Sequence, residues 1–337
     1  MDKKPLIVIT LGDPAGIGPE IIAKAFSKGE LGEYCRPIVI GDANCLRRIS
    51  EISCPSLRII PISDLESAKF RAGTIEIIDL DNVPETLCWG AASPEGGKAS
   101  VDFIQHAADL ALSGRADAIV TAPINKKSLQ LAGYYWPGHT EMLAEYSKST
   151  DVALMMLGRR LRVTLATLHI PLNEVAYQLT QEIVERSIRL THGWLSRFSA
   201  DSMNIAVTGL NPHCGDEGRF GDEERNVIFP AIEKVRSEGI NADGPFPADS
   251  FFGRGLAYDY GAVVAMYHDQ GLIPTKMDSE GEAVNLTLGI PILRTSVDHG
   301  TAYDIAGQNR AAPRSLLAAL KTAAKFATTQ IVTYEKT

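Results

Sequence analysis

The sequence has no long apolar run, no excess of positive charge and no paired cysteine motif. Its apolar runs stay short of the roughly 18 residues that a membrane-spanning helix needs. The first of them, residues 6–11, runs into Gly12-Asp13-Pro14 as a buried strand would, rather than as a signal peptide. Asp and Glu (41) outnumber Lys and Arg (33), and the net charge of −8 argues against a broad nucleic-acid surface. The five cysteines form no Cys-x-x-Cys pair, which predicts reduced thiols in a cytoplasmic protein.

Short apolar runs alternate along the chain with longer stretches of helical periodicity. The apolar runs have the length of buried strands. This alternation is typical of an α/β protein with a largely parallel sheet, and 337 residues suit two domains. The predicted strands are residues 6–11, 37–40, 118–120, 161–168, 204–208, 262–266 and 290–296; the predicted helices are residues 19–26, 99–113, 141–146, 181–198, 223–238 and 315–329.

A histidine follows three of the predicted strands. These are His169 after Val163-Thr-Leu-Ala-Thr-Leu, His213 after Ile205-Ala-Val-Thr-Gly-Leu-Asn-Pro, and His268 after Ala262-Val-Val-Ala-Met-Tyr. Open α/β sheets place ligand sites at the carboxyl ends of their strands. Three imidazoles there could converge on one divalent metal with a position left open for substrate. Alternatively, each histidine separately satisfies a hydrogen bond at its strand end, and the pattern alone leaves both interpretations open.

Two segments at predicted helix starts could hold an anion. Gly12-Asp-Pro-Ala-Gly-Ile-Gly-Pro-Glu20 follows the first strand and opens a helix, where backbone N–H groups favour negative charge. It matches neither a Walker A loop nor the Rossmann GxGxxG spacing, and a tight strand-to-helix turn is the alternative interpretation. Thr140 precedes residues 141–146, either as a helix cap or as an anion donor.

Further polar residues lie between or beside the late apolar runs. Lys276, Asn285 and Arg294 could grip a phosphate or carboxylate, which arginine binds with two parallel hydrogen bonds. Asp249 and Asp269 are candidates for acid–base work or for orienting a metal ligand. Helix capping or turn formation is the simpler interpretation, and we favour it for Asp269.

Five motifs follow one another along the chain between residues 12 and 302. They are Gly12-Asp-Pro-Ala-Gly-Ile-Gly-Pro-Glu20, Gly138-His-Thr-Glu141, Gly209-Leu-Asn-Pro-His213, Met266-Tyr-His-Asp-Gln-Gly271 and Arg294-Thr-Ser-Val-Asp-His-Gly-Thr-Ala302. Together they resemble the 4-hydroxythreonine-4-phosphate dehydrogenase family of vitamin B6 biosynthesis. The resemblance implies NAD-dependent oxidation of the C3 hydroxyl of 4-phosphohydroxy-L-threonine. Loss of CO2 from the resulting keto acid would then give 3-amino-2-oxopropyl phosphate.

The resemblance also implies roles for individual residues. The metal ligands would be His169, His213 and His268, with one of the three supplied by the partner subunit of a homodimer. The metal would be zinc, with magnesium or cobalt as substitutes. The substrate, a small phosphorylated hydroxy acid, would be held by His139, Thr140, Lys276, Asn285 and Arg294. Asp249 and a metal-bound hydroxide are our two candidates for the proton acceptor.

A second resemblance concerns the cofactor and the fold. His299-Gly-Thr-Ala-Tyr-Asp-Ile-Ala-Gly307 is similar to the segment that binds NAD adenosine in isocitrate and isopropylmalate dehydrogenases. It implies cofactor-binding roles for Gly300, Thr301, Ala302 and Asp304, the last as a residue that positions the loop. It also implies two interleaved α/β domains with a cleft. We expect an outer domain of residues 1–125 plus 290–337 on the NAD side. The inner domain, residues 126–289, would carry the metal site and the dimer interface.

Substrate and class alternatives remain at this stage. Ser250 and Ala122 depart from the family pattern, and paralogues act on D-threonate or D-erythronate 4-phosphate or on a carboxylated aromatic cis-dihydrodiol. Lys276, Asn285 and Arg294 favour a phosphorylated substrate over the diol. A phosphate acyltransferase, which needs neither metal nor NAD, is a more distant alternative, and a pure binding module is a third. The strand-end histidines and residues 299–307 argue against the acyltransferase.

Overall fold

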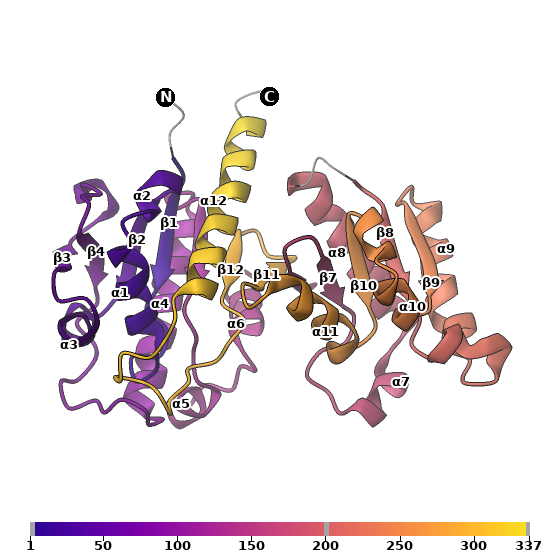
Figure 1. Cartoon of the computed structure of the whole chain (residues 1–337), viewed down its shortest axis with the longest axis horizontal. Coiled ribbons are helices and arrows are strands. Elements are labelled where there is room, and N and C mark those ends of the chain that lie inside the picture. Colours follow the sequence, from indigo (N-terminus) through magenta and orange to yellow (C-terminus); the bar gives the residue numbers. More distant parts are fainter. Residues whose placement is uncertain (1–3, 199–201, 335–337) are drawn as a thin grey trace. The chain divides into compact units, whose positions relative to one another are not determined.

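A computed structural model describes residues 4–198 and 202–334 of the chain. The chain forms two compact units, Met1–Thr150 with Ile290–Thr337, and Asp151–Gly289 (Figure 1). Strands and helices alternate in both, which confirms the α/β class, and the first unit is built from both ends of the chain, as interleaving requires. The expected boundary at residue 126 differs from this division. Helices α5 (Lys126–Leu131) and α6 (His139–Tyr146) pack against α4 (Pro94–Leu112) in the first unit.

The first unit is built on six parallel strands. Their order is β3-β4-β2-β1-β5-β12, and every neighbouring pair is parallel. The central strand β1 is apolar and buried along its whole length, because helices cover both faces of such a sheet. The strands are β1 (Leu6–Thr10), β2 (Arg36–Gly41), β3 (Arg58–Ile62), β4 (Thr74–Asp79), β5 (Ala118–Thr121) and β12 (Arg294–Ser296).

Two groups of helices surround this sheet. Helix α1 contacts α3 and α12, whereas α4 contacts α5 and α6. Helix α3 begins at Asp42, whose carboxylate caps it by accepting a hydrogen bond from Cys45 N at 2.8 Å. The remaining helices of the unit are α1 (Gly18–Ser27), α2 (Leu31–Tyr34), α3 (Ala43–Ser53), the 3₁₀ turn η1 (Leu65–Ser67) and α12 (Arg314–Tyr334).

The second unit has a mixed sheet in the order β11-β6-β7-β10-β8-β9. Strands β7, β10, β8 and β9 are parallel, while β6 pairs antiparallel with both β7 and β11. Only four residues separate β6 from β7, too few for the crossover that parallel pairing needs. The strands are β6 (Ala153–Leu157), β7 (Arg162–Leu165), β8 (Ile205–Thr208), β9 (Ala242–Phe246), β10 (Ala262–Ala265) and β11 (Val284–Leu288).

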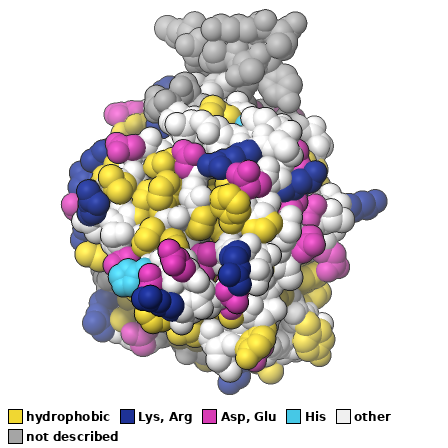
Figure 2. Space-filling view, turned by 90° about the vertical axis from the view of Figure 1, so that its right-hand side faces the viewer, with side chains coloured by type: hydrophobic (Ala, Val, Ile, Leu, Met, Phe, Trp, Pro, Cys, Tyr) yellow, Lys and Arg dark blue, Asp and Glu magenta, His cyan; other side chains and the backbone are white. Residues whose placement is uncertain are grey.

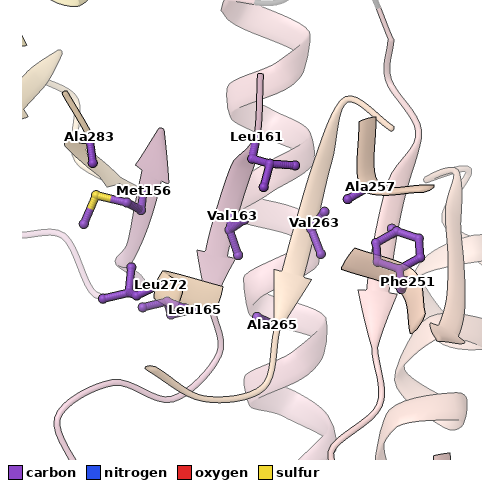
Figure 3. Close-up of a cluster of buried hydrophobic side chains, with 11 residues drawn as sticks. Met156, Leu161, Val163, Leu165, Phe251, Ala257, Val263, Ala265, Leu272 and Ala283 are labelled. Carbon is purple, nitrogen blue, oxygen red and sulfur yellow. The ribbon is translucent and has the colours of Figure 1, made fainter. Parts of the chain in front are cut away.

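Helices pack on both sides of this second sheet. Helix α8 (Gln181–Phe198) contacts β6, β7, β8 and β10, while α11 (His268–Ser279) contacts β6, β7 and β10. Figure 3 shows Val163 of β7 beside Val263 of β10, and the two are paired in register. Leu272 of α11 and Phe251 of α10 close the same apolar cluster. The remaining elements are η2 (Leu172–Glu174), α7 (Val175–Gln178), η3 (Pro212–Gly218), the π-helix η4 (Glu224–Ile228), α9 (Phe229–Ser237), α10 (Ala248–Gly253) and η5 (Leu256–Asp259).

Every strand and helix expected from the sequence has a counterpart at or near its predicted place. The late strand is shorter than predicted, Arg294–Ser296, and the predicted helix at 223–238 divides into the π-helix η4 and helix α9. Strands β3, β4, β6, β9 and β11 and helices α2, α3, α5, α7, α10 and α11 were not predicted. In the part of the chain that the structure describes, no helix is both long and apolar enough to cross a membrane. On the face seen in Figure 2, basic and acidic side chains are interspersed with apolar ones.

Candidate functional site

Two of the three strand-end histidines lie close together. His169 follows β7 and His268 follows β10, and these strands are parallel neighbours, so both residues leave the same edge of the sheet. Thr167 connects the segment after β7 to the segment after β10, because its N and Oγ1 atoms donate hydrogen bonds to Met266 O at 3.1 and 2.7 Å. The ring centroids of His169 and His268 are 5.9 Å apart. Two imidazoles on one zinc ion have a centroid separation of roughly 5–6 Å, and the separation of this pair lies in that range.

The imidazole of His268 is held in one orientation. Its Nδ1 atom lies 2.6 Å from Oδ1 of Asp269. A carboxylate accepts a hydrogen bond from a protonated Nδ1 atom. Nε2 is then the nitrogen that can bind a metal, as in many histidine–metal sites. The interpretation of Asp269 as a simple helix cap was therefore wrong. Helix α11 has Tyr267 at its N-cap without a side-chain cap, and Asp269 contacts the imidazole instead.

His213 lies in an unusual backbone segment. Residues 213–217 all have positive φ, from 44° to 81°, and only Gly215 among them is a glycine. A left-handed turn costs about 1–2 kcal/mol for each residue that carries a Cβ, so surrounding contacts must hold it. Within residues 4–198 and 202–334, no three His, Cys, Asp or Glu side chains are grouped as a metal site would require. The structure brings His169 and His268 together without His213, and the three-histidine site remains a prediction for the homodimer.

Three of the predicted substrate residues belong to the first unit. His139 and Thr140 open α6, and Arg294 opens β12. Arg294 is only 2% exposed, and its Nε and Nη2 atoms donate to Thr121 Oγ1 at 3.1 and 2.7 Å. Burial lowers the pKa of Arg294 from 12.5 to about 9, although the nearby Glu141 carboxylate acts in the opposite direction. A cation placed so deeply is suited to an anionic ligand.

His139 complements this buried cation. Its Nε2 atom is buried and has no hydrogen-bond partner. Burial, and then the charge of Arg294, lowers the pKa of His139 well below its usual 6.5, so the imidazole is neutral. Thr140, next to it, is buried as well. The structure therefore brings His139 and Arg294 together, and Nε2 remains available to a ligand.

Lys276, Asn285 and Asp249 belong to the second unit. Lys276 is exposed in the last turn of α11, while Oδ1 of Asn285 in β11 is buried without a hydrogen-bond partner. Asp249 is exposed near the start of α10. It lines a cavity of about 530 Å³ together with Asp269 and mostly apolar side chains of α10, η5 and α11. This cavity places both candidate carboxylates on the side of the unit where His268 begins α11.

The predicted cofactor segment rests on the glycine-rich turn after β1. Thr301 O accepts a hydrogen bond from Ile17 N at 3.0 Å, and Asn125 Nδ2 donates to Thr301 Oγ1 at 3.3 Å. A Cβ on Gly16 would lie 2.9 Å from the Cβ of Thr301, and Gly12 has a φ of +73°. The glycines of the turn thus serve close packing, which favours the tight-turn interpretation over an open anion cradle. Of the other segment residues, Gly300 and Asp304 are exposed and Ala302 has a φ of +43°.

Asp13 and Tyr303 form a partly buried hydrogen-bonded pair that the sequence analysis did not single out. Asp13 is fully buried, and the Tyr303 hydroxyl donates to its Oδ2 at 2.7 Å. Burial raises the pKa of Asp13 above its usual 3.8 despite this hydrogen bond and another from Ala15 N. Ser128 Oγ lies 2.9 Å from the same hydroxyl. A charged residue immediately after a buried strand was the signal that could have identified Asp13.

Comparison with known proteins identifies the family of the chain. The model of the family described as "Pyridoxal phosphate biosynthetic protein PdxA" matches residues 33–323. The chain belongs to the PdxA family. A 4-hydroxythreonine-4-phosphate dehydrogenase of Desulforapulum autotrophicum is 46% identical over 97% of both chains. A D-threonate 4-phosphate dehydrogenase of Cupriavidus necator is 43% identical over 97% of this chain and 98% of its own.

A solved structure in the PdxA family has the same fold. The 4-hydroxythreonine-4-phosphate dehydrogenase of Klebsiella pneumoniae is 40% identical and superposes with a TM-score of 0.89, covering 96% of this chain and 99% of its own. This family resemblance, expected from the five motifs, is confirmed. The protein is a dehydrogenase of the group that contains 4-hydroxythreonine-4-phosphate and D-threonate 4-phosphate dehydrogenases. The comparisons thus favour a dehydrogenase over an acyltransferase or a binding module.

Proposed function

We propose that the protein oxidises 4-phosphohydroxy-L-threonine at C3 with NAD in pyridoxal 5′-phosphate biosynthesis. Hydride leaves C3 for NAD⁺ and the hydroxyl proton is released, which gives a β-keto acid and NADH. The bond between C2 and the carboxylate then breaks, CO2 departs, and protonation of C2 gives 3-amino-2-oxopropyl phosphate. Membership of the PdxA family supports this reaction class.

The observation that carries the phosphorylated substrate is the buried guanidinium of Arg294. A cation that is 2% exposed is costly to keep charged, and a phosphate oxygen pair would offset that cost with two parallel hydrogen bonds. His139 supports the same interpretation, because its neutral imidazole has a buried Nε2 atom without a partner. In this proposal Thr140, Lys276 and Asn285 complete the substrate contacts.

The proposed metal site uses His169, His213 and His268, with zinc as the expected ion and magnesium or cobalt as substitutes. When bound, a divalent ion would polarise the substrate hydroxyl and stabilise negative charge on its oxygen. The chain itself would orient the metal ligands. Asp269 fixes the tautomer of His268, and the segments that follow β7 and β10 set the separation of the His169 and His268 rings. Asp249 lines the adjacent cavity, and we assign it the role of proton acceptor.

The proposed NAD site is the segment that contains Gly300, Thr301, Ala302 and Asp304. Hydrogen bonds from Ile17 and Asn125 hold its Thr301 in place. This rigid attachment would fix the loop before the cofactor arrives, which lowers the entropy cost of binding. Exposure of Gly300 and Asp304 leaves their polar atoms accessible to a cofactor.

We further propose a homodimer in the cytoplasm. Ile273 and Met277 of α11 are 59% and 77% exposed and line the cavity with Asp249 and Asp269, which supports a contact surface for a second subunit. The five cysteines are free thiols, three of them buried, which supports a reducing compartment.

The decisive experiment measures NADH formation by the purified full-length protein. 4-Phosphohydroxy-L-threonine, D-threonate 4-phosphate and D-erythronate 4-phosphate would be compared, each with and without EDTA. Turnover of the amino acid, abolished by EDTA and restored by zinc, is the expected result. Turnover that survives EDTA would contradict the metal requirement.

D-threonate 4-phosphate is the second candidate substrate. Relatives named for it match nearly the whole chain at 43–44% identity. The two substrates differ only in an amino group against a hydroxyl, and Arg294 and His139 suit the phosphate of either. Turnover of the sugar-acid phosphate alone would move the protein to that activity and keep the proposed mechanism.

A further inference from the structure

The left-handed turn that carries His213 is held by one buried carboxylate. Glu224 is 6% exposed and follows the turn in sequence. Its Oε1 atom accepts hydrogen bonds from Leu210 N and Asn211 N, both at 2.7 Å. Its Oε2 atom accepts from Asn211 Nδ2 at 3.0 Å. Three donors immediately before His213 thus converge on one side chain.

Two glycines allow the carboxylate to lie against both sides of the turn. A Cβ on Gly209 would lie 3.0 Å from Glu224 Oε1, and a Cβ on Gly215 would lie 3.0 Å from Oε2. Glu224 therefore contacts the chain before and after His213. It is also the first residue of the π-helix Glu224–Ile228, and such turns frequently occur at functional sites.

A second side chain connects the same loop to the helix of His268. Gln270 Nε2 donates to Gly209 O at 2.7 Å, and Gln270 Oε1 accepts from Met266 N at 2.7 Å and Thr208 Oγ1 at 2.8 Å. Gln270 thereby joins the carboxyl ends of β8 and β10. The loop before His213 is fixed to α11 on one side and to Glu224 on the other.

We propose that Glu224 is a positioning residue, which holds His213 in the geometry for a divalent metal. The proposal rests on the metal site of the proposed function. Backbone conformations that are costly for residues with a Cβ persist only where neighbours determine them. Here the neighbour that contacts both ends of the turn is Glu224. Without its charge-assisted hydrogen bonds, residues 213–217 would relax and the His213 imidazole would move from the metal.

The test compares Glu224→Gln with a matched control in the full-length protein. Glutamine keeps the shape of the side chain, but its NH2 group replaces Oε2. This NH2 group cannot accept the hydrogen bond that Asn211 Nδ2 donates. The control is Glu76→Gln in the other unit. Glu76 is 5% exposed and accepts from Lys69 N and Phe70 N, both at 2.8 Å, so it also holds two successive amides. Both variants lose a similar local contact, and only Glu224 contacts the His213 loop.

The measurement is Co²⁺ binding to metal-stripped protein, followed by visible absorption. We expect Glu224→Gln to weaken Co²⁺ binding about tenfold or more, as loss of a group that orients a ligand typically does. Glu76→Gln should stay within about twofold of the wild type by the same measure. Amide exchange at residues 210 and 211 should be faster in metal-free Glu224→Gln, which reports positioning without any metal.

Each contrary outcome identifies what fails. Wild-type Co²⁺ affinity in Glu224→Gln, with binding lost in His213→Ala, would overturn the positioning role and leave the metal site intact. Unchanged binding in His213→Ala would overturn both the ligand role of His213 and this proposal. If Glu224→Gln does not fold, Gly209→Ala disturbs the same turn, because its Cβ would lie 2.8 Å from Cys214 Sγ and 3.0 Å from Glu224 Oε1. Wild-type affinity in that variant would equally refute the role of Glu224.

Discussion

Replacing Arg294 with methionine should stabilise the ligand-free protein and abolish its affinity for phosphate. Burial lowers the pKa of Arg294 far below the usual value for arginine, to about 9, which means that the fold disfavours the charged guanidinium by roughly 5 kcal/mol. Methionine fills similar space without a charge, but it leaves the buried Thr121 hydroxyl without its donors, at a cost of about 1–3 kcal/mol. The balance is a gain of about 2–4 kcal/mol, or a melting temperature higher by roughly 5–10 °C.

The pH dependence of this gain follows from the direction of the pKa change. The native pKa of Arg294 lies below its unfolded value, so the penalty is fully present below about pH 9 and is lost as pH rises towards 12.5. Urea unfolding at pH 7.5 and pH 10.5 in phosphate-free buffer should therefore show the advantage of Arg294→Met shrinking at the higher pH.

A matched control removes an arginine whose environment favours its charge. Glu238 and Glu185 hydrogen-bond to Arg189 and raise its pKa. Arg189→Met should therefore lower stability slightly, by about 1 kcal/mol or less for such a partly exposed group. Inorganic phosphate should raise the melting temperature of the wild type and leave Arg294→Met unchanged. A variant that is less stable than the wild type at pH 7.5, or that phosphate still stabilises, would refute the reasoning.

Three further predictions concern individual groups. Asp269→Asn should weaken Co²⁺ binding about tenfold while leaving the fold intact, because it loosens the orientation of the imidazole; unchanged affinity would contradict this role. Asp13→Asn should raise stability in urea at pH 7, because burial raises the native pKa of Asp13, and this gain should vanish as pH falls through that pKa towards 3.8. Gly12→Ala should cost about 2 kcal/mol or more, since its Cβ would lie 2.5 Å from a carbonyl oxygen at a φ of +73°. Gly29→Ala has a φ of +74° in open space and should cost only about 1 kcal/mol, and equal losses would show that the contact is unimportant.

The fold could be predicted wherever burial leaves a strong local pattern. Strands β1, β5 and β10 are apolar along their length because helices cover both faces of the sheet, and the sequence shows that directly. Strand β3 escaped prediction because it is partly exposed and contains Pro61, as edge strands do. Helix α11 escaped because Gly271 and Pro274 interrupt it and its apolar residues do not form one stripe.

The sequence predicted candidate residues that follow a strand better than residues that act through contacts distant in the chain. His169 and His268 were found by their position, and the parallel pairing of β7 with β10 explains why they meet. Glu224 could not be found in this way. It binds a loop 13 and 14 residues before it, and nothing in the local sequence indicates that the loop is left-handed. Gln270 lies 61 residues from the carbonyl that it contacts.

The ligands proposed for the two units have opposite charge, and the side chains proposed to bind them have different surroundings. The first unit buries Arg294 and a neutral His139, and in the proposed function these low-dielectric surroundings strengthen the attraction of an anion. In the second unit His169 and His213 are exposed. Asp269 and the left-handed turn would orient the proposed metal ligands there. A metal ion needs ligands at fixed angles more than it needs a dry site, whereas a phosphate held by one arginine needs a low dielectric. Substitutions of the buried site residues in the first unit should therefore lower the affinity for phosphate and raise the stability of the protein. Substitutions around the proposed metal ligands of the second unit should lower the affinity for metal with little gain in stability.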